Sequence, residues 1–567
     1  MRKTFFYTIS MFLLIIFIVP LSTFAESTLD VNVKYGIQNK VQMGKPIPIN
    51  IVLTNHGKND LNGDFAIYSN PTYNMNGSYV IPVSIPSGES KELNIVIRGL
   101  LEHSTNGSLY SFFEGGVKNG KEIKLTGNIY STPSAFPSER VVAGILSNDT
   151  ANLNYFRLMR LHGIPIEIVN VDPIQISTDP NGLALLDIFI VHNFDLQQLS
   201  IEQRSSIKEW VYQGGTLLFD TNMNITNSLK DLSEFLLLTP TSTTQLSSPQ
   251  QMPSELTVFN GSVANNSVKV ITKENDVPIT LSKQFRKGTV IQFTTSFNNE
   301  KITEWKEANE YFRSVLTKTV SPKNVELKYG YNQEEELSSS MSYIGDIYPG
   351  NVISVPILII GFVLYLLIIS PILYFVLKKK NKREHAWWIV PSIAIITSIL
   401  IFTIGAKDRL KGTQINESSI LILDGESGSG YGVVSFLSNS GGQYDVKSNH
   451  IDLFPVSKIY RGDSNIAKKY AYVHVGEQSN TIQFNDVEFW SIRSAVGPIR
   501  NVHLGSFSSK LEINEGNLEG LVRNNLPIHL SDVYILTGSD VYEIGSLKSG
   551  QEAQLTFSIG NVSATHI

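Results

Sequence analysis

Alternating apolar and polar positions run through the first part of the chain. Val31, Val33 and Tyr35 are separated by polar neighbours, and residues 47–53 place isoleucine or leucine at every second position. The turn-forming sequence Asn-His-Gly-Lys-Asn-Asp follows at 55–60. A period of two residues, interrupted by Gly, Asn and Pro, is typical of antiparallel strands in a β-sandwich. We therefore predict a β-sandwich over residues 26–135.

The last part of the chain repeats this pattern. Residues 84–97 (SIPSGESKELNIVI) align with residues 546–559 (SLKSGQEAQLTFSI), with Ser, Gly, Leu and Ile in register. Asn55 and Asn524 each stand at a predicted strand end, at the same interval before the leucine that opens the next strand. The repeat predicts a second sandwich in the last part of 407–567. Chance similarity between β sequences is the alternative.

Residues 138–320 change to short apolar runs that alternate with helical patterns. The predicted strands occupy residues 141–146, 164–169, 187–192, 216–219 and 288–293. A helix is predicted over residues 151–162, and another starts at a capping box between Ser200 and Gln203 and ends at Gly214. Strands that alternate with helices indicate a parallel, three-layer α/β sheet.

Three apolar runs indicate export and a membrane anchor. Residues 1–25 combine a basic start, an apolar stretch and small residues, which is the pattern of a signal peptide; an uncleaved anchor is the alternative. Residues 352–377 and 386–406 are each long and apolar enough for a transmembrane helix. Pro371 should kink the first of these helices.

A short loop at residues 378–385 sets the expected topology. It carries five basic residues, and the positive-inside rule places such a loop in the cytoplasm. The expected localisation is the cell membrane, multi-pass, with a linker at 321–351 and with large domains outside the cytoplasm, among them an extracytoplasmic β domain at 407–567. The basic loop could also bind a cytoplasmic partner or anionic lipid.

Composition excludes several kinds of chemistry. The net charge is -5, so no excess of positive charge indicates a nucleic-acid partner. The cysteine count is zero, which excludes a thiol nucleophile, a cysteine zinc site and an iron–sulfur cluster. The ten histidines show no metal-ligand spacing, and we expect neither a metal nor a cofactor.

The stretch LDIFIVHNFDLQQLSIEQRSSIKEWVYQGGTLLFDTN at 186–222 resembles the core of the class I glutamine amidotransferase-like fold. The order of the regions resembles large bacterial membrane proteins that join an Ig-like domain, this α/β domain, transmembrane helices and an outer β domain. The resemblance implies an Ig-like sandwich at 26–135 and an amidotransferase-like domain at 138–320. It also implies partners among other envelope proteins, with a MoxR-type ATPase system as one possibility.

The amidotransferase reaction needs a cysteine on a tight turn after the strand at 216–219. Here the turn reads Phe-Asp-Thr-Asn-Met at 219–223, without a cysteine, so the domain is expected to be degenerate and without catalytic residues. Ligands of open α/β sheets bind at the carboxyl ends of the strands. The polar residues expected to form a candidate ligand rim there are Asn148, Asp149, His192, Asn193, Asp220, Thr221 and Asn222. Ordinary loop polarity is the alternative, and Thr221 with His192 as its base is a conceivable but sterically poor nucleophile.

These patterns favour a non-catalytic cell-envelope scaffold, sensor or accessory membrane protein that binds a protein or glycan partner outside the membrane. One alternative is an envelope hydrolase that uses Asp220 or His192 of the α/β domain. Another is an accessory subunit of a transporter or wall-processing complex, whose basic loop meets a cytoplasmic ATPase. The missing nucleophile favours the non-enzymatic hypotheses.

Overall fold

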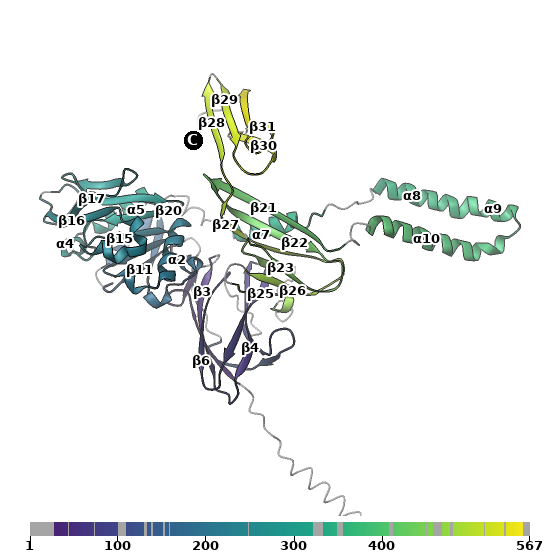
Figure 1. Cartoon of the computed structure of the whole chain (residues 1–567), viewed down its shortest axis with the longest axis horizontal. Coiled ribbons are helices and arrows are strands. Elements are labelled where there is room, and N and C mark those ends of the chain that lie inside the picture. The colour runs from purple at the N-terminus through teal and green to yellow at the C-terminus, as the bar shows by residue number, and fades with distance from the viewer. Residues whose placement is uncertain are drawn as a thin grey trace, which may run out of the picture. The chain divides into compact units, whose positions relative to one another are not determined.

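The computed structural model (Figure 1) consists mainly of β-strands in several sheets. It describes residues 28–558 except 43–44, 73, 100–108, 130–132, 138–139, 151–152, 158, 248, 321–332, 349–354, 407–411, 450, 458–467, 477–479, 515 and 538–539. The expected signal peptide at 1–25 lies outside the described residues. The chain divides into two compact units, Met1–Pro71 with Tyr79–Asn332, and Thr72–Ser78 with Gln333–Ile567.

The first unit begins with two sheets, and the strands at 29–35 and 47–55 bury every second residue. One sheet has the order β6-β3-β1-β9, with the strands β1 Leu29–Tyr35, β3 Ile47–Asn55, β6 Ser90–Ile97 and β9 Leu125–Gly127. The strands of the other are β4 Leu61–Thr72, β5 Met75–Ile85, β7 Tyr110–Glu114 and β8 Lys121–Ile123. The hydroxyls of Tyr35 and Tyr110 meet between the two sheets. The sequence prediction of a β-sandwich is therefore confirmed for this region. A short parallel pair, β2 Lys40–Gln42 with β10 Ser134–Phe136, accompanies it.

An eight-stranded sheet follows, in the order β12-β13-β11-β14-β15-β20-β19-β18. Its strands are β11 Val141–Ser147, β12 Arg160–Leu161, β13 Ile164–Asn170, β14 Ile188–His192, β15 Thr216–Asp220, β18 Lys269–Glu274, β19 Val277–Phe285 and β20 Gly288–Phe293. The neighbours from β13 to β20 pair in parallel, whereas β12, β19 and β18 join in antiparallel fashion. A separate antiparallel hairpin is formed by β16 Leu238–Gln245 and β17 Thr257–Val263.

Both faces of this sheet are buried. On one face, helix α2 Ile201–Tyr212 packs Trp210 edge-on against Phe189. On the other, helix α5 Ala308–Thr319 packs Phe312 against Phe293. The predicted capping box is confirmed, because the side chains of Ser200 and Gln203 bond each other's backbone N–H. The remaining helical segments are short: η1 Asn154–Phe156, η2 Pro173–Gln175, η3 Pro180–Leu183, η4 Leu196–Gln198, α3 Ile225–Leu229, η5 Lys230–Phe235 and α4 Glu300–Thr303.

The prediction of a helix at 151–162 is wrong. The described residues form η1 and then β12, which pairs with β13 across a two-residue turn. The turn residues His162 and Gly163 have φ values of 48° and 83°. Positive φ at both central residues is what a tight hairpin turn requires. The apolar side chains Phe156, Met159 and Leu161 are buried, but Phe156 belongs to η1 and Leu161 to the hairpin strand β12, so no single helix carries them.

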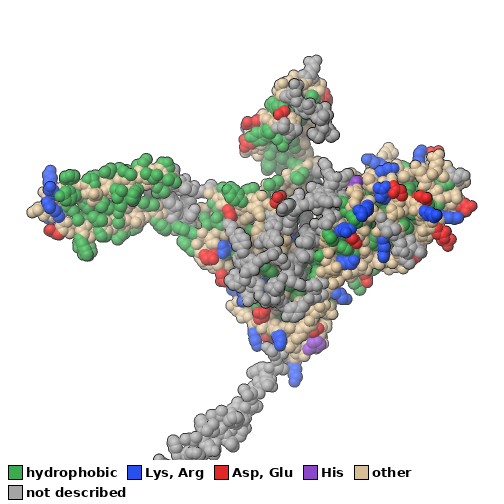
Figure 2. Space-filling view, turned by 180° about the vertical axis from the view of Figure 1, so that it is seen from behind, with side chains coloured by type: hydrophobic (Ala, Val, Ile, Leu, Met, Phe, Trp, Pro, Cys, Tyr) green, Lys and Arg blue, Asp and Glu red, His purple; other side chains and the backbone are tan. Residues whose placement is uncertain are grey.

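Two helical segments are long and apolar enough to cross a membrane, Val355–Lys379 and Arg383–Thr403. The first consists of α8 Val355–Leu367, a π-helical turn η6 Ile368–Ile372 and α9 Leu373–Lys379. Pro371 lies in η6, so the expected irregularity occurs there as a π-helical turn. After η7 Arg383–His385 comes α10 Ala386–Ala406. Hydrophobic side chains cover these helices, with Lys and Arg at the loop end (Figure 2).

The expected linker at 321–351 contains a helix, α7 Gln333–Gly345, that the sequence analysis missed. It packs on β21 Gln414–Asp424, β22 Ser427–Leu437 and β27 Ile492–His503. The amide of Asn416 donates to the carbonyls of Gly345 and Ile347 at 3.1 and 3.0 Å. Residues 333–347 therefore belong to the second unit and are not a free linker.

The second unit holds one larger sheet and a smaller terminal region. Besides β21, β22 and β27, the larger sheet contains β23 Gly442–Lys447, β24 Phe454–Val456, β25 Ala471–His474 and β26 Thr481–Val487. Met75, which belongs to the Thr72–Ser78 segment of this second unit, pairs with Val456 of β24. The terminal region has a sheet of β28 Phe507–Asn514, β29 Asn517–Asn524 and β32 Glu552–Ser558, and a pair of β30 Leu530–Thr537 with β31 Asp540–Leu547. The predicted 407–567 domain is therefore two successive β regions.

Candidate functional site

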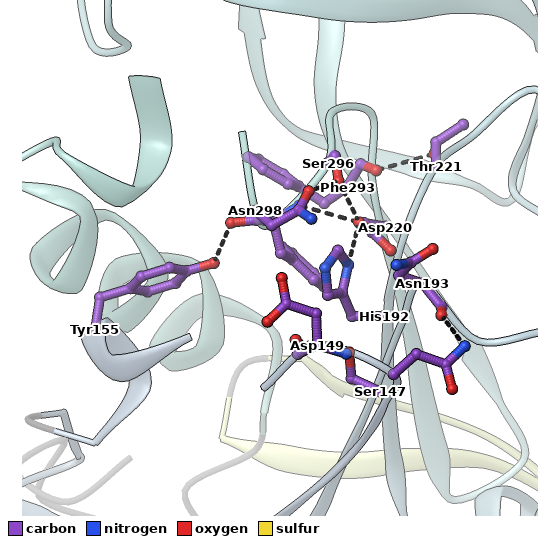
Figure 3. Close-up of polar contacts among 12 residues, drawn as sticks. Ser147, Asp149, Tyr155, His192, Asn193, Asp220, Thr221, Phe293, Ser296 and Asn298 are labelled. Carbon is purple, nitrogen blue, oxygen red and sulfur yellow. Dashed lines mark hydrogen bonds and ion pairs between the residues drawn. The ribbon is translucent and has the colours of Figure 1, made fainter. Parts of the chain in front are cut away.

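Parallel pairing brings the carboxyl ends of β11, β14 and β15 to one edge of the eight-stranded sheet. Ser147 pairs with His192, and Asp220 at the end of β15 pairs with Phe293. The expected rim residues Asn148, Asp149, His192, Asn193, Asp220, Thr221 and Asn222 end these three strands or directly follow them. Figure 3 shows that His192 and Asp220 face each other within this group.

The centre of the edge is a buried histidine–aspartate pair. His192 Nδ1 lies 2.7 Å from Asp220 Oδ2, and the two side chains are 1% and 7% exposed. The same carboxylate oxygen accepts hydrogen bonds from the Ser296 hydroxyl at 3.1 Å and from the Phe297 backbone N–H at 3.0 Å. The other ring nitrogen, His192 Nε2, is buried and has no hydrogen-bond partner in the described part of the chain.

Three contributors to the site were missed by the sequence analysis, namely Tyr155, Ser296 and Phe297. The Tyr155 hydroxyl donates to the Phe297 carbonyl at 3.1 Å. Burial, and secondarily the nearby Asp220 carboxylate, raises the pKa of Tyr155 well above its ordinary value of 10.0. Ser296 could have been found from the sequence, because it follows the carboxyl end of β20. This strand is a fourth parallel strand, and its carboxyl end lies at the same edge of the sheet as the other rim residues.

Thr221 does not join the pair. Its hydroxyl donates to the Phe293 carbonyl at 2.9 Å and accepts from the Gln292 amide at 2.9 Å, and the residue is fully buried. Gln292 is itself fixed, because its Oε1 accepts from the Leu237 and Leu238 N–H groups, both at 2.8 Å. The Thr221 hydroxyl is thus committed to the interior (Figure 3), and the structure shows no hydrogen bond between it and His192.

The other rim residues bond mainly to the backbone. The Asn148 amide donates to the Asn193 carbonyl at 2.9 Å. Asn222 Oδ1 accepts from the Asn224 N–H at 2.8 Å, as in a local turn. A cavity of about 10 Å³ lies beside Asn193, Asp220 and Asn222, which is room for about one water molecule. No group of three or more His, Asp or Glu side chains within the described ranges is placed to hold a metal ion.

A larger pocket of about 290 Å³ lies at the opposite end of the strands, away from the rim. Lys45, Asp187 and Trp210 line it. Lys45 Nζ lies 2.9 Å from Asp187 Oδ1, and Asp187 Oδ2 accepts from the Val142 N–H at 2.7 Å. The charged side chains that line the pocket, Lys45 and Asp187, are therefore paired with each other and with the backbone. This pairing indicates a structural role for both.

Two family models match the ends of the chain. Residues 28–129 match a domain of unknown function, DUF8726, and residues 506–566 match another domain of unknown function, DUF8725. Comparison with curated proteins finds no relative of the chain.

Solved structures give only weak likenesses. A cytoplasmic protein of Salmonella typhimurium is 17% identical, with a TM-score of 0.26, and the match covers 32% of this chain and 100% of that one. A second cytoplasmic protein, of Salmonella typhimurium LT2, is 14% identical over the same shares, with a TM-score of 0.26. A GH20 exo-β-N-acetylglucosaminidase from Vibrio harveyi is 10% identical, with a TM-score of 0.13, and the match covers 38% of this chain and 61% of that one. At these TM-scores the likenesses carry no argument about fold or function.

Proposed function

We propose that the chain is a non-catalytic, membrane-anchored protein of the bacterial cell envelope. It acts as a scaffold, sensor or accessory subunit whose large domains bind a protein or glycan outside the membrane. The two helices long and apolar enough to span a bilayer support the anchor. The basic loop between them supports a cytoplasmic location for residues 378–385, where a MoxR-type ATPase system is a candidate partner.

The same proposal assigns residues 138–320 to a degenerate amidotransferase-like α/β domain and residues 26–135 to an Ig-like sandwich. The parallel order from β13 to β20 supports the first assignment. Helix α2, which connects β14 to β15, supports it as well. The two sheets, whose strands pair in antiparallel fashion except for β1 with β9, support the second.

The observation that carries the non-catalytic role is that Asp220 and Thr221, the two groups at the end of β15, are already engaged by the protein itself. Asp220 Oδ2 already accepts three hydrogen bonds, and the Thr221 hydroxyl is engaged on both sides in the interior. The adjacent cavity has room for about one water molecule. A substrate needs an open pocket many times larger than this. The arrangement therefore supports a structural rim around a sheet that presents other surfaces to a partner.

Single cysteines test the topology, because the chain has no cysteine of its own. Ser247→Cys and Ser508→Cys should both react with a membrane-impermeant maleimide on intact cells. Glu384→Cys, in the basic loop, should react only after the membrane is permeabilised. Protection of Ser508→Cys on intact cells would overturn the two-span topology, and labelling of Glu384→Cys on intact cells would overturn the cytoplasmic loop.

The second candidate function is an envelope hydrolase with His192 as general base. It is favoured by the unpartnered Nε2 of His192, because an aspartate on the opposite ring nitrogen is how a catalytic imidazole is oriented. His192→Asn separates the two functions. An asparagine amide can still donate to Asp220 but provides no base.

The non-catalytic proposal predicts that His192→Asn changes neither partner capture from membranes nor any release of soluble fragments from purified cell wall. His503→Asn, at a histidine that is 73% exposed, is the matched control. Loss of wall-fragment release in a His192→Asn protein that melts cooperatively, with the control unaffected, would establish the hydrolase instead.

A further inference from the structure

The turn between β26 and β27 presents two stacked aromatic rings. Phe489 and Trp490 have ring centroids 4.8 Å apart with an interplanar angle of 20°, and Phe489 is 54% exposed. Trp490 has a φ of 56°, a conformation that bulky residues rarely adopt. The backbone N–H of Trp490 donates to the Ser438 carbonyl at 3.2 Å. Glu488 precedes them, and residues 488–490 are called the aromatic turn below.

The aromatic turn is continuous with the apolar surface of helix α10. The rings of Trp490 and Phe402 stack with centroids 5.9 Å apart and an interplanar angle of 22°. Phe402 stands one turn before the end of α10 at Ala406, which corresponds to about 6 Å along the helix axis. The rings of the turn therefore lie at the level of the last turn of a helix that is apolar enough to span a membrane.

A third apolar side chain belongs to the same end of the sheet. Ile415, at the start of β21, is 72% exposed. The neighbouring Gln414 pairs with Leu437, which in turn pairs with Ile492 of β27, two residues after Trp490. An exposed isoleucine and an exposed phenylalanine thus share the end of the sheet from which the chain leads back to α10.

We propose that the aromatic turn, together with Ile415, inserts into the lipid headgroup layer on the outer side of the bilayer that α8 and α10 span. This inference rests on the membrane anchoring proposed above. Aromatic side chains are enriched in this layer, which lies between the hydrocarbon core and bulk water. Their rings bury apolar surface there without having to enter the hydrocarbon core. The insertion holds the sheet that contains β21, β22 and β27 against the membrane surface, at the end that carries Ile415 and the aromatic turn.

Charge indicates that the rings, and not basic residues, make this contact. Glu488 is 71% exposed and pairs with Arg493, and Asp486 is also exposed. Carboxylates are not attracted to anionic headgroups. Docking should therefore occur on zwitterionic phosphatidylcholine and should depend little on ionic strength.

A cysteine-linked fluorophore measures this contact in the full chain. Glu488→Cys carries the NBD fluorophore beside the rings, in vesicles of phosphatidylcholine that contain a lipid with a spin label near the headgroup. Glu426→Cys is the matched control, because both glutamates are 71% exposed and pair with a basic residue. It lies beyond the far end of the eleven-residue strand β21, about 35 Å away at roughly 3.3 Å per residue.

The expected result is quenching at least threefold greater at position 488 than at 426, with little change when anionic lipid or salt is added. Adding Phe489→Ser to the labelled Glu488→Cys chain should reduce the quenching at 488. Phe362→Cys in α8 reports insertion independently, through the blue shift of NBD emission in the hydrocarbon layer. A blue shift at 362 with equal, weak quenching at 488 and 426 would overturn the aromatic contact alone. Quenching at 488 that requires anionic lipid would also overturn it, and absence of the blue shift at 362 would instead overturn the membrane anchor.

Discussion

The N-terminal sandwich and the C-terminal β region close the same turn with a buried asparagine, although they match different family models. Asn55 ends β3 and Asn524 ends β29, and both residues are 0% exposed. The Asn55 amide donates to the carbonyls of Asn59 and Ile85 at 2.8 and 3.1 Å. The Asn524 amide donates to those of Ile528 and Leu547 at 2.9 and 3.1 Å.

The backbone around each asparagine repeats as well. The Asn55 carbonyl accepts from the Gly88 N–H at 2.9 Å, and the Asn524 carbonyl accepts from the Gly550 N–H at 2.7 Å. The two glycines have φ values of 75° and 78°, a left-handed conformation for which glycine is the least strained residue. The similarity of the two sequences, SIPSGES and SLKSGQE, is thus a structural repeat.

The surroundings of the two turns differ greatly. The N-terminal turn belongs to a sandwich in which β9 also covers β1, and Tyr35 and Tyr110 meet between the sheets. The C-terminal turn is supported by a small cluster of Val522, Val533, Leu547 and Leu555. There Leu536 and Ile513 remain 74% and 69% exposed. The same turn therefore forms with a large core around it and with a small one, and the hydrogen bonds of the buried asparagine are common to both.

The comparison predicts that Asn55→Ala and Asn524→Ala each destabilise their own region strongly. Each substitution leaves buried carbonyls without a donor, at a cost of about 2–3 kcal/mol. Hydrogen exchange of the full chain, followed by mass spectrometry, should show loss of protection in β3 and β6 for the first variant. The second should affect β29 and β32.

Asn50→Ala is the control for this experiment. Asn50 lies on the same strand as Asn55 and bonds Glu92 and Asn94, but these contacts are exposed, and the loss should stay within about 0.5 kcal/mol. If Asn55→Ala and Asn524→Ala behaved like this control, the buried asparagine would not be what holds the two turns.

The repeat and the rim were predictable from the sequence for physical reasons. Asn and Gly occupy fixed positions in these turns, because one must satisfy carbonyls and the other must adopt positive φ. His192 and Asp220 were predictable as neighbours, because parallel strands end at one edge.

The remaining features had no periodic signal in the sequence. The apolar residues Phe156, Met159 and Leu161 fit a helix, but the turn at His162 and Gly163 makes Leu161 part of a hairpin strand and leaves Phe156 in η1. Tyr155 reaches the site from the short 3-10 helix η1 and Ser296 from the loop after β20, and the position of both segments follows from tertiary packing and not from local residue preference.

A smaller effect distinguishes the two regions at high pH. Burial is the main cause that raises the pKa of Tyr35 and of Tyr110 above the ordinary value of 10.0. The unfolded chain therefore loses these protons first as the pH rises. The stability due to the neutral tyrosines is present below pH 10 and declines above it. In the C-terminal region, by contrast, the side chain of Tyr534 is 51% exposed.

Raising the pH from 9 to 11 should thus reduce hydrogen-exchange protection of the N-terminal sandwich more than that of β28–β32, after correction for the intrinsic rate. Tyr110→Phe should remove about 1 kcal/mol at neutral pH through the lost hydrogen bond to Tyr35, and it should also weaken the alkaline loss. Tyr534→Phe is the control, and it should change neither the stability at neutral pH nor the loss of protection at alkaline pH. An alkaline loss of the same size in both regions, or one unchanged by Tyr110→Phe, would show that the buried tyrosine pair does not set the difference.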